Sequence, residues 1–345
     1  IVEIENDGYD ANSSIQDLAN KLNAATTPGT YAFINPDTVN GVNSLGTDAI
    51  KVGLLYQPAR IAPVGATAAL NTTAFINGGD SAARNRASLL QAFQSTSGET
   101  FLVNVNHLKS KGSACDVADA LDGQGNCNLV RLAAVNELLA WFAANPTGTG
   151  DPDLLVVGDL NSYAKEDPIA AFETAGYTNM VNHFGGATAY SYVFDGQWGY
   201  LDYGIASPSL LAQTAGFADW HINSDEPSVL DYNTNFKTAG QITDLYNPEP
   251  FRASDHDPVM VGLSLDSITR LSPVGTISMI GSPGRITPPK VLNFIFLTMP
   301  SLGLRTSART PWSVALARSS RTRAISNSVL PSSSWASRRN LTSIS

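Results

Sequence analysis

The sequence predicts an α/β fold over residues 1–266, on three observations. Short apolar or alternating segments are typical of strands, and 99–107 and 153–159 are the clearest of them. Apolar residues recur at helical spacing over 129–144, which predicts a helix. Finally, apolar residues make up 43% of the chain, enough for a sizeable core.

The other elements follow in chain order. Ser13 is expected to cap a helix, because its hydroxyl can accept a hydrogen bond from the first turn. A second short helix is expected over 168–175. Segments 65–83 and 217–250 are polar or acidic and predict loops. Further strands are expected at 1–5, 31–34, 48–56, 60–64, 259–265 and, as two strands around the turn Asp195-Gly196, within 190–206.

Charge divides the chain at about residue 267. Residues 1–267 hold all 30 Asp and Glu and 11 of the 21 Lys and Arg, a net charge of −19. The rest holds ten Lys and Arg and no acid, a net charge of +10. The acidic part argues against a protein that binds nucleic acid by bulk electrostatics, and suits either a soluble secreted enzyme or one whose local site charge is supplied by bound cations.

The tail over 267–345 shows no sustained hydrophobic period, and we assign it no fold. It is either a basic disordered extension or a stretch translated out of its natural frame, and the scattered aromatic and aliphatic residues favour the second. No run of 18 apolar residues exists, so no membrane-spanning helix is expected.

Two cysteines, Cys115 and Cys127, flank a Gly/Asp/Asn loop. An even count in a polar loop favours a disulfide formed in an oxidising compartment. The alternative is a pair of free thiols in a cytosolic protein. The loop over 109–128 is long enough to be functional or anchored.

Asp159 and Asn161 stand where the apolar strand 153–159 ends. Residues two apart in an extended chain project from the same face, so the carboxylate and the carboxamide are expected to point together. The alternative is a turn that merely closes the strand, since Asp and Asn both favour turns.

Four other segments place reactive side chains at apparent strand ends. Glu3 and Asp255 offer the hard oxygen ligands that Mg²⁺ prefers. His107 and His256 can donate to a phosphate or supply a proton to a leaving group. Asp202, buried beside a histidine, would orient the ring and hold it charged. With Asp159 orienting or deprotonating a water and Asn161 fixing its geometry, these parts describe metal-assisted hydrolysis of a phosphoester.

The motifs themselves resemble a known family. In this order, Glu3 is followed by Asn-His-Leu-Lys-Ser-Lys-Gly at 106–112, Gly-Asp-Leu-Asn at 158–161, Leu-Asp-Tyr at 201–203 and Ser-Asp-His-Asp-Pro at 254–258. This series resembles the endonuclease/exonuclease/phosphatase superfamily over roughly residues 1–266, and more narrowly its bacterial extracellular nucleases. The resemblance implies the deoxyribonuclease I-like fold, a four-layer α/β sandwich of two mixed sheets packed face to face with helices outside. It also implies a requirement for Mg²⁺, Mn²⁺ or Ca²⁺.

The resemblance assigns a role to each matching residue. Glu3 matches the metal-binding glutamate, with Glu5 as the alternative, and Asp255 matches the second metal-side carboxylate. The catalytic positions match His107, Asp159, Asn161, Asp202 and His256, where Asp202 pairs with His256. Arg86 resembles a phosphate-contacting arginine, although the proline that usually follows is Ala87 here.

The family also has a strand upstream of the glutamate that ends in an asparagine beside the metal. No counterpart precedes Glu3 in this sequence, and no signal peptide is visible at its start. We therefore expect a domain over 1–266 whose first strand is missing. We expect this chain to be unstable or weakly active, and an added upstream strand to rescue its nuclease activity.

The function expected from these features is a secreted, metal-dependent nuclease that cleaves DNA, with RNA left open, and no protein partner is implied. One alternative is a phosphatase or phospholipase C of the same fold. A lipid enzyme should show an exposed hydrophobic hairpin, and no tryptophan-rich loop of that kind stands out in the sequence. The other alternative is an inactive, truncated binding module.

Overall fold

The structure is a computed structural model that describes residues 1–230, 237–245 and 251–265, together with the backbone of 291–296. It has a mixed α/β fold, as the sequence predicts. Apart from the strand over 291–296, the tail that was assigned no fold lies outside the described residues. None of the described helices is long and apolar enough to cross a membrane.

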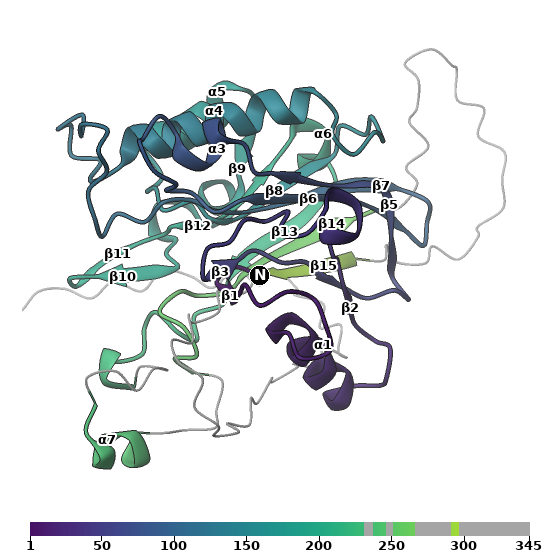
Figure 1. The fold of residues 1–345 in the computed structure, drawn as a ribbon, viewed down its shortest axis with the longest axis horizontal. Helices are drawn as coiled ribbons and strands as arrows, with labels where there is room; N and C mark the ends of the chain where they lie inside the picture. Colours follow the sequence, from purple (N-terminus) through teal and green to yellow (C-terminus); the bar gives the residue numbers. More distant parts are fainter. Residues whose placement is uncertain (231–236, 246–250, 266–290, 297–345) are drawn as a thin grey trace, which may run out of the picture. The chain divides into compact units, whose positions relative to one another are not determined.

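A six-stranded mixed sheet forms the centre of the fold (Figure 1). Neighbouring strands are antiparallel except for β7 and β8, which run parallel because the long helix α4 connects them. Both strands that the sequence marks most clearly, over 99–107 and 153–159, are confirmed here as β7 and β8. In spatial order the sheet consists of β5 (Ile61–Leu70), β6 (Ser88–Ser95), β7 (Thr100–His107), β8 (Leu154–Asp159), β12 (Asp202–Ala206) and β9 (Thr178–Asn179).

Helices cover one face of this sheet (Figure 1). They are α3 (Thr73–Asn77), α4 (Asn128–Ala143) and α5 (Asp167–Thr174). Alternate strand residues such as Leu102 and Val156 point to this face and form one apolar cluster with Leu138 of α4 and Phe172 of α5. The helix expected over 129–144 is thereby confirmed.

The opposite face packs against smaller sheets. Val103 and Val157 belong to a second apolar cluster that includes Val261. The strands on this side are β13 (Thr214–Asp219), β14 (Val259–Ser264) and β15 (Val291–Phe296), joined as an antiparallel sheet. Two short antiparallel pairs complete the described strands near the N-terminus: β1 (Ile4–Glu5) with β3 (Ile50–Lys51), and β2 (Ala32–Phe33) with β4 (Leu55–Tyr56). A six-stranded sheet between helices and smaller sheets is thus what the described residues show, and a four-layer sandwich stays a prediction.

The first helix, α1 (Ser14–Ala25), begins at the expected cap, where the Ser13 hydroxyl accepts a hydrogen bond from the Gln16 amide. The remaining helices and turns are short: α2 (Asp37–Asn40), α6 (Pro208–Leu211), α7 (Ala239–Asp244), a π-helical turn at Val181–Gly185 and 3₁₀ turns at Gly186–Thr188 and Ser228–Leu230.

Two expected loops contain regular structure. Within 65–83, strand β5 continues to Leu70 and α3 follows, because Leu70 and Phe75 are buried in the cluster under the helices. Within 217–250, β13 extends to Asp219 and α7 begins at Ala239 with a capping box from Thr238. Small residues such as the alanines of β5 have little strand propensity, so this part of the strand forms because of its tertiary packing.

The hairpin expected around Asp195-Gly196 is confirmed as β10 (Tyr192–Phe194) and β11 (Gln197–Gly199). The disulfide between Cys115 and Cys127 is also present, with the two Cα atoms 5.3 Å apart. It ties the loop before α4 to the helix N-terminus, where Cys127 is the N-cap residue.

Candidate active site

Three expected site residues lie in one row across the central sheet. The register pairs His107 of β7 with Asp159 of β8, and Asp159 with Asp202 of β12. Opposed residues on neighbouring strands project to the same face, so the three side chains lie together on the face of the central sheet that packs against β14. Gly158 permits this approach, since a Cβ atom there would lie 2.0 Å from the Asn106 carbonyl oxygen.

Asp159 ends β8 and also closes a turn. Its carboxylate accepts the Asn161 backbone amide at 2.7 Å and the Asn161 side-chain amide at 2.8 Å. Asn161 adopts a positive φ of 48° and donates to the Leu108 carbonyl oxygen at 3.0 Å. The turn and the pairing of the two side chains are therefore both present, and Asn161 links the loops that follow β7 and β8.

Glu3 meets this row from the N-terminal segment. The expected strand over 1–5 bends at Glu3, whose φ is 62°, an uncommon value outside glycine. Its Oε1 atom lies 3.5 Å from Nε2 of His107, which is itself 3.6 Å from Oδ2 of Asp159. Glu5 instead accepts the Ser14 hydroxyl at 2.8 Å. Of the two glutamates left open by the sequence, Glu3 is the one that faces the site.

Burial controls the charge states of this group. It raises the pKa of Glu3 to about 7, with His256 lowering that pKa and Asp255 raising it. It also raises the pKa of Asp159, which is further raised by the charges of Asp202 and Glu3 and lowered by that of His256. Burial holds the pKa of His107 well below its usual value, helped by the positive charges of Arg86 and His256. His107 is therefore a neutral imidazole at pH 7.

Asp202 and His256 form a second pair beside the row. Nδ1 of His256 lies 2.7 Å from Oδ2 of Asp202, and the Ser191 hydroxyl donates to the same oxygen at 2.8 Å. Burial lowers the pKa of His256, but the charge and hydrogen bond of Asp202 outweigh it and raise that pKa to about 10. His256 is thus an imidazolium at neutral pH. The half-buried Asp255 precedes it, and its charge acts on both His256 and Glu3.

Arg86 reaches the site from the segment before β6. Its Nη1 atom lies 3.4 Å from Nε2 of His107, and its Nε atom donates to Asp48 at 2.9 Å. The arginine is therefore held beside the histidine by a carboxylate that the sequence analysis did not single out.

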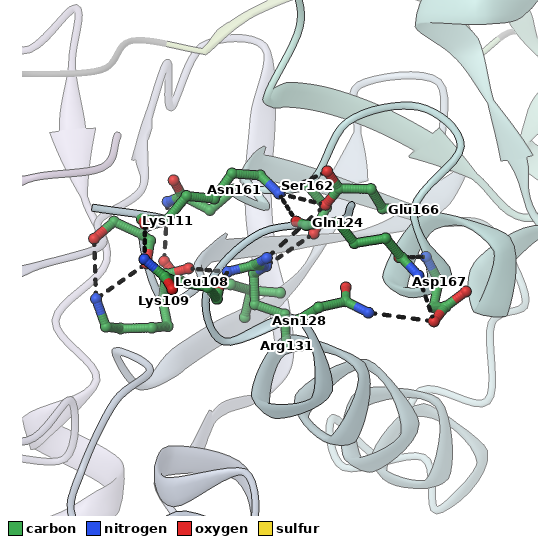
Figure 2. A network of polar contacts seen from close by, with 12 residues as sticks. Leu108, Lys109, Lys111, Gln124, Asn128, Arg131, Asn161, Ser162, Glu166 and Asp167 are labelled. Carbon is green, nitrogen blue, oxygen red and sulfur yellow. Dashed lines mark hydrogen bonds and ion pairs between the residues drawn. The ribbon is translucent and has the colours of Figure 1, made fainter. Parts of the chain in front are cut away.

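A buried cation joins the loops that follow β7 and β8 (Figure 2). Arg131 of α4 is fully buried and donates to the Lys109 carbonyl oxygen at 3.0 Å and the Ser162 hydroxyl at 3.2 Å. Its guanidinium also donates to the Asn126 carbonyl oxygen at 2.7 Å, in the disulfide-closed loop. Glu166 lies 3.9 Å from Nη2 of Arg131 and accepts Lys111 Nζ at 2.6 Å. The loops after β7 and β8 are thus fixed by one side chain.

Sequence reasoning missed Asp48, Arg131 and Ser191, and also Tyr192, whose ring lies 4.5 Å from that of His256. A polar or charged residue on the apolar side of a helix, as Arg131 is in α4, is a signal that could have been used. Ser191 and Asp48 carry no such signal, because loops are rich in serine and aspartate for ordinary reasons.

Glu3 and Asp255 are the candidate ligands for the expected metal ion. Among the described residues, no three or more His, Cys, Asp or Glu are grouped so as to hold a metal ion. Mg²⁺ commonly takes only one or two protein carboxylates, with water and substrate oxygens filling the rest. Glu3 and Asp255 are the two carboxylates that such a site would use, and they lie close enough for the Asp255 charge to raise the pKa of Glu3.

No protein-family model matches this chain, and no curated protein matches it. Solved structures do. An endonuclease/exonuclease/phosphatase family protein from Bacteroides thetaiotaomicron is similar at 13% identity over 59% of this chain and 69% of its own, with a TM-score of 0.42. The mannosyl-6-phosphatase of the same organism is similar at 13% identity over 59% and 71%, with a TM-score of 0.43. The human Nocturnin catalytic domain is similar at 18% identity over 60% and 66%, with a TM-score of 0.40.

The superfamily that the sequence motifs resemble is named among these structures. The resemblance is carried residue by residue by the motifs at 106–112, 158–161, 201–203 and 254–258. Independently of the resemblance, the structure pairs His107 with Asp159 and brings His256 to Asp202.

Proposed function

We propose that this chain is a metal-dependent phosphodiesterase of the endonuclease/exonuclease/phosphatase superfamily that hydrolyses DNA, with RNA left open. The observation that carries the proposal is the Asp202–His256 pair standing beside the row of His107 and Asp159. It supplies a buried imidazolium next to a carboxylate whose pKa is raised by burial. Hydrolysis of a phosphodiester needs one group that donates a proton and another that accepts one, and His256 and Asp159 are suited to these two roles.

In this proposal Asp159 orients the attacking water and takes its proton. A carboxylate with a raised pKa is a stronger base than an exposed one, so burial favours this role. Asn161 fixes the carboxylate through its two hydrogen bonds and keeps the water in line with phosphorus.

His256 acts on the phosphate from the other side. Its Nδ1 atom is engaged by Asp202, so Nε2 is the nitrogen that donates to a phosphate oxygen or to the leaving oxygen. The water oxygen loses a proton to Asp159 and bonds to phosphorus, the bond to the leaving oxygen breaks, and that oxygen takes a proton from Nε2 of His256 or from solvent. Neutral His107 and the cationic Arg86, which lie side by side, would hold the remaining phosphate oxygens.

Glu3 and Asp255 would hold a divalent cation, Mg²⁺, Mn²⁺ or Ca²⁺. When bound, the cation would neutralise charge on the phosphate and polarise it for attack. Secretion is proposed as well, supported by the Cys115–Cys127 disulfide, which is typical of oxidising compartments.

The direct test is cleavage of plasmid DNA and of a labelled single-stranded oligonucleotide with Mg²⁺, Mn²⁺ or a chelator. We expect cleavage that needs the cation and that falls at least a hundredfold in the His256→Ala variant. If the His256→Ala variant cleaves DNA as fast as the parent does, another site or a contaminant is responsible. A folded parent that cleaves neither substrate under any cation would contradict the proposal.

A lipid phosphodiesterase is the second candidate, and one observation favours it. The β10–β11 hairpin exposes 64% of Phe194 and 71% of Trp198. No tryptophan-rich loop stands out in the sequence and the hairpin holds a single tryptophan, but pairing of its two short strands exposes one large aromatic ring on each face. Hydrolysis of sphingomyelin vesicles with Mg²⁺, measured beside DNA cleavage, separates the two candidates.

A further inference from the structure

The aromatic residues of the β10–β11 hairpin lie on two different faces. Tyr192 opposes Gly199 and Phe194 opposes Gln197, so these four share one face, while Val193 opposes Trp198 on the other. The Phe194 ring is stacked on that of Tyr192, with 6.4 Å between centroids and 13° between planes. Trp198 is stacked instead on Tyr190, outside this face.

The face with Tyr192 continues directly into the candidate active site. The Tyr192 ring lies 4.5 Å from the His256 ring, and an isolated β-bridge joins the two residues. A ladder of rings therefore runs from the imidazolium outward through Tyr192 to the exposed Phe194.

A third ring reaches the same face from the other catalytic loop. Tyr163 follows Asn161 and Ser162, and its ring packs against Gly199 so closely that a Cβ atom there would lie 2.7 Å from it. Lys111 Nζ stands 5.4 Å from the centre of the Tyr163 ring. The base of the aromatic face, where Tyr192 pairs with Gly199, is thus in contact both with Tyr163 of the Asp159 loop and with His256.

We propose that Tyr192, Phe194 and Tyr163 form a stacking subsite for a nucleobase of an unpaired nucleic-acid strand, next to the scissile phosphate. This inference rests on the proposed function and adds its substrate class. A base and its sugar are the groups that flank a phosphodiester in nucleic acid, and aromatic faces bind bases of any sequence by stacking. Unpaired bases are required because a base paired in a duplex offers no free face.

The hairpin tip argues against insertion into a lipid bilayer. Asp195 and Gln197 are exposed between Phe194 and Trp198, and Asp195 occupies the turn with a φ of 50°. Insertion of the two aromatic rings would carry the carboxylate into the apolar region, which is costly. A base stacked on one face of the hairpin leaves Asp195 in water.

The test compares two single-stranded oligothymidylates of equal length, one normal and one in which tetrahydrofuran abasic units replace the nucleosides on both sides of the scissile bond. We expect the parent to prefer the normal strand. Phe194→Ala should lower kcat/KM on the normal strand about tenfold, equivalent to about 1.4 kcal/mol, and change it less than about twofold on the abasic strand. Phe194→Trp should keep the preference.

Trp198→Ala is the matched control, since it removes an equally exposed ring from the opposite face of the same hairpin. We expect it to leave both rates unchanged. An equal loss on the normal strand in both alanine variants would overturn the proposal in favour of general damage to the hairpin, as would no loss in Phe194→Ala.

Further outcomes distinguish a failure of the proposed function from a failure of the stacking subsite alone. If the parent cleaves neither strand and no plasmid DNA, the proposed function fails together with the subsite, whereas cleavage of plasmid DNA alone would overturn only the subsite. If it cleaves both strands equally well, the proposed function stands and the subsite alone is wrong. Sedimentation with phosphatidylcholine–sphingomyelin vesicles that is lost in both Phe194→Ala and Trp198→Ala would show a membrane-binding hairpin and overturn the subsite.

Discussion

Oδ2 of Asp202 accepts Nδ1 of His256 at 2.7 Å across 54 residues of sequence. Asp202 has no exposed surface, and the same oxygen also accepts the Ser191 hydroxyl at 2.8 Å. A buried carboxylate so bonded stabilises the charged ring and fixes its orientation. The two residues are therefore expected to act as one unit.

That unit can be tested by a double-mutant cycle. Asp202→Asn and His256→Ala should each lower kcat on single-stranded DNA by about 10²–10⁴-fold. The double variant should be no worse than the poorer single variant, since either change removes the charged, oriented ring. Losses that multiply in the double variant would show that the residues act independently. Thermal melting of each variant guards against unfolding as the cause.

The proposed metal-binding role of Glu3 can be tested with Glu5 as the control. Addition of Mg²⁺ or Mn²⁺ should raise the Tm of the parent, because a ligand that binds only the folded state stabilises it. Glu3→Gln and Asp255→Asn should each abolish this shift and weaken binding in calorimetry. Glu5→Gln should retain it, because Glu5 bonds Ser14 and not the site. Loss of the shift in the Glu5 variant alone would reverse the assignment.

Arg131 is expected to be a positioning residue as well as a structural one. Arg131→Met removes hydrogen bonds to Lys109, Asn126 and Ser162 and leaves Glu166 without its buried partner. We expect a loss of about 3–5 kcal/mol in the free energy of unfolding, measured by urea denaturation. We also expect kcat to fall more than KM rises, since Asn161 and His107 lose their support.

Lys165→Met is the matched control for that experiment, because Lys165 is exposed one residue before Glu166. Lys165→Met should change neither the free energy of unfolding nor kcat by much. Arg131→Lys should restore part of the stability and part of kcat together. A stable Arg131→Met variant with normal kcat would mean that the loops are held by other contacts, such as the disulfide.

Asp219 should make the fold less stable as pH rises. Burial raises its pKa to about 7, with His221 lowering that pKa and Asp202 and Asp257 raising it, and its Oδ1 atom is buried without a hydrogen bond. Below about pH 4 the carboxyl is protonated in both folded and unfolded states. Between about pH 4 and 7 the unfolded chain releases the proton first, so the free energy of unfolding falls.

Asp219→Asn removes this titration. The variant should match the parent near pH 4 and become the more stable of the two by pH 8, as measured by urea denaturation at several pH values. Asp195→Asn, at the exposed hairpin tip, should show no such divergence. A parent that gains stability over the variant from pH 4 to 8 would reverse the sign and show that Asp219 is held as a carboxylate.

The sequence alone determined the strands and helices with a strong period, and it named the candidate site residues. The run 153–159 is apolar and bounded by Pro152 and Gly158, so strand β8 and the position of Asp159 at its end follow from local pattern. Segment 65–83 lacked such a pattern, and its strand and helix form because Leu70 and Phe75 are buried by distant residues.

Only the tertiary structure decided which of these residues meet. The register of β7, β8 and β12 aligns His107, Asp159 and Asp202, and the choice of Glu3 over Glu5 depends on a bend that no period reveals. Arg131 and the aromatic face of the hairpin likewise depend on contacts between segments far apart in the chain. Local sequence encodes periodicity and residue type, whereas strand register and burial are set by the whole chain, which is the physical reason for the division.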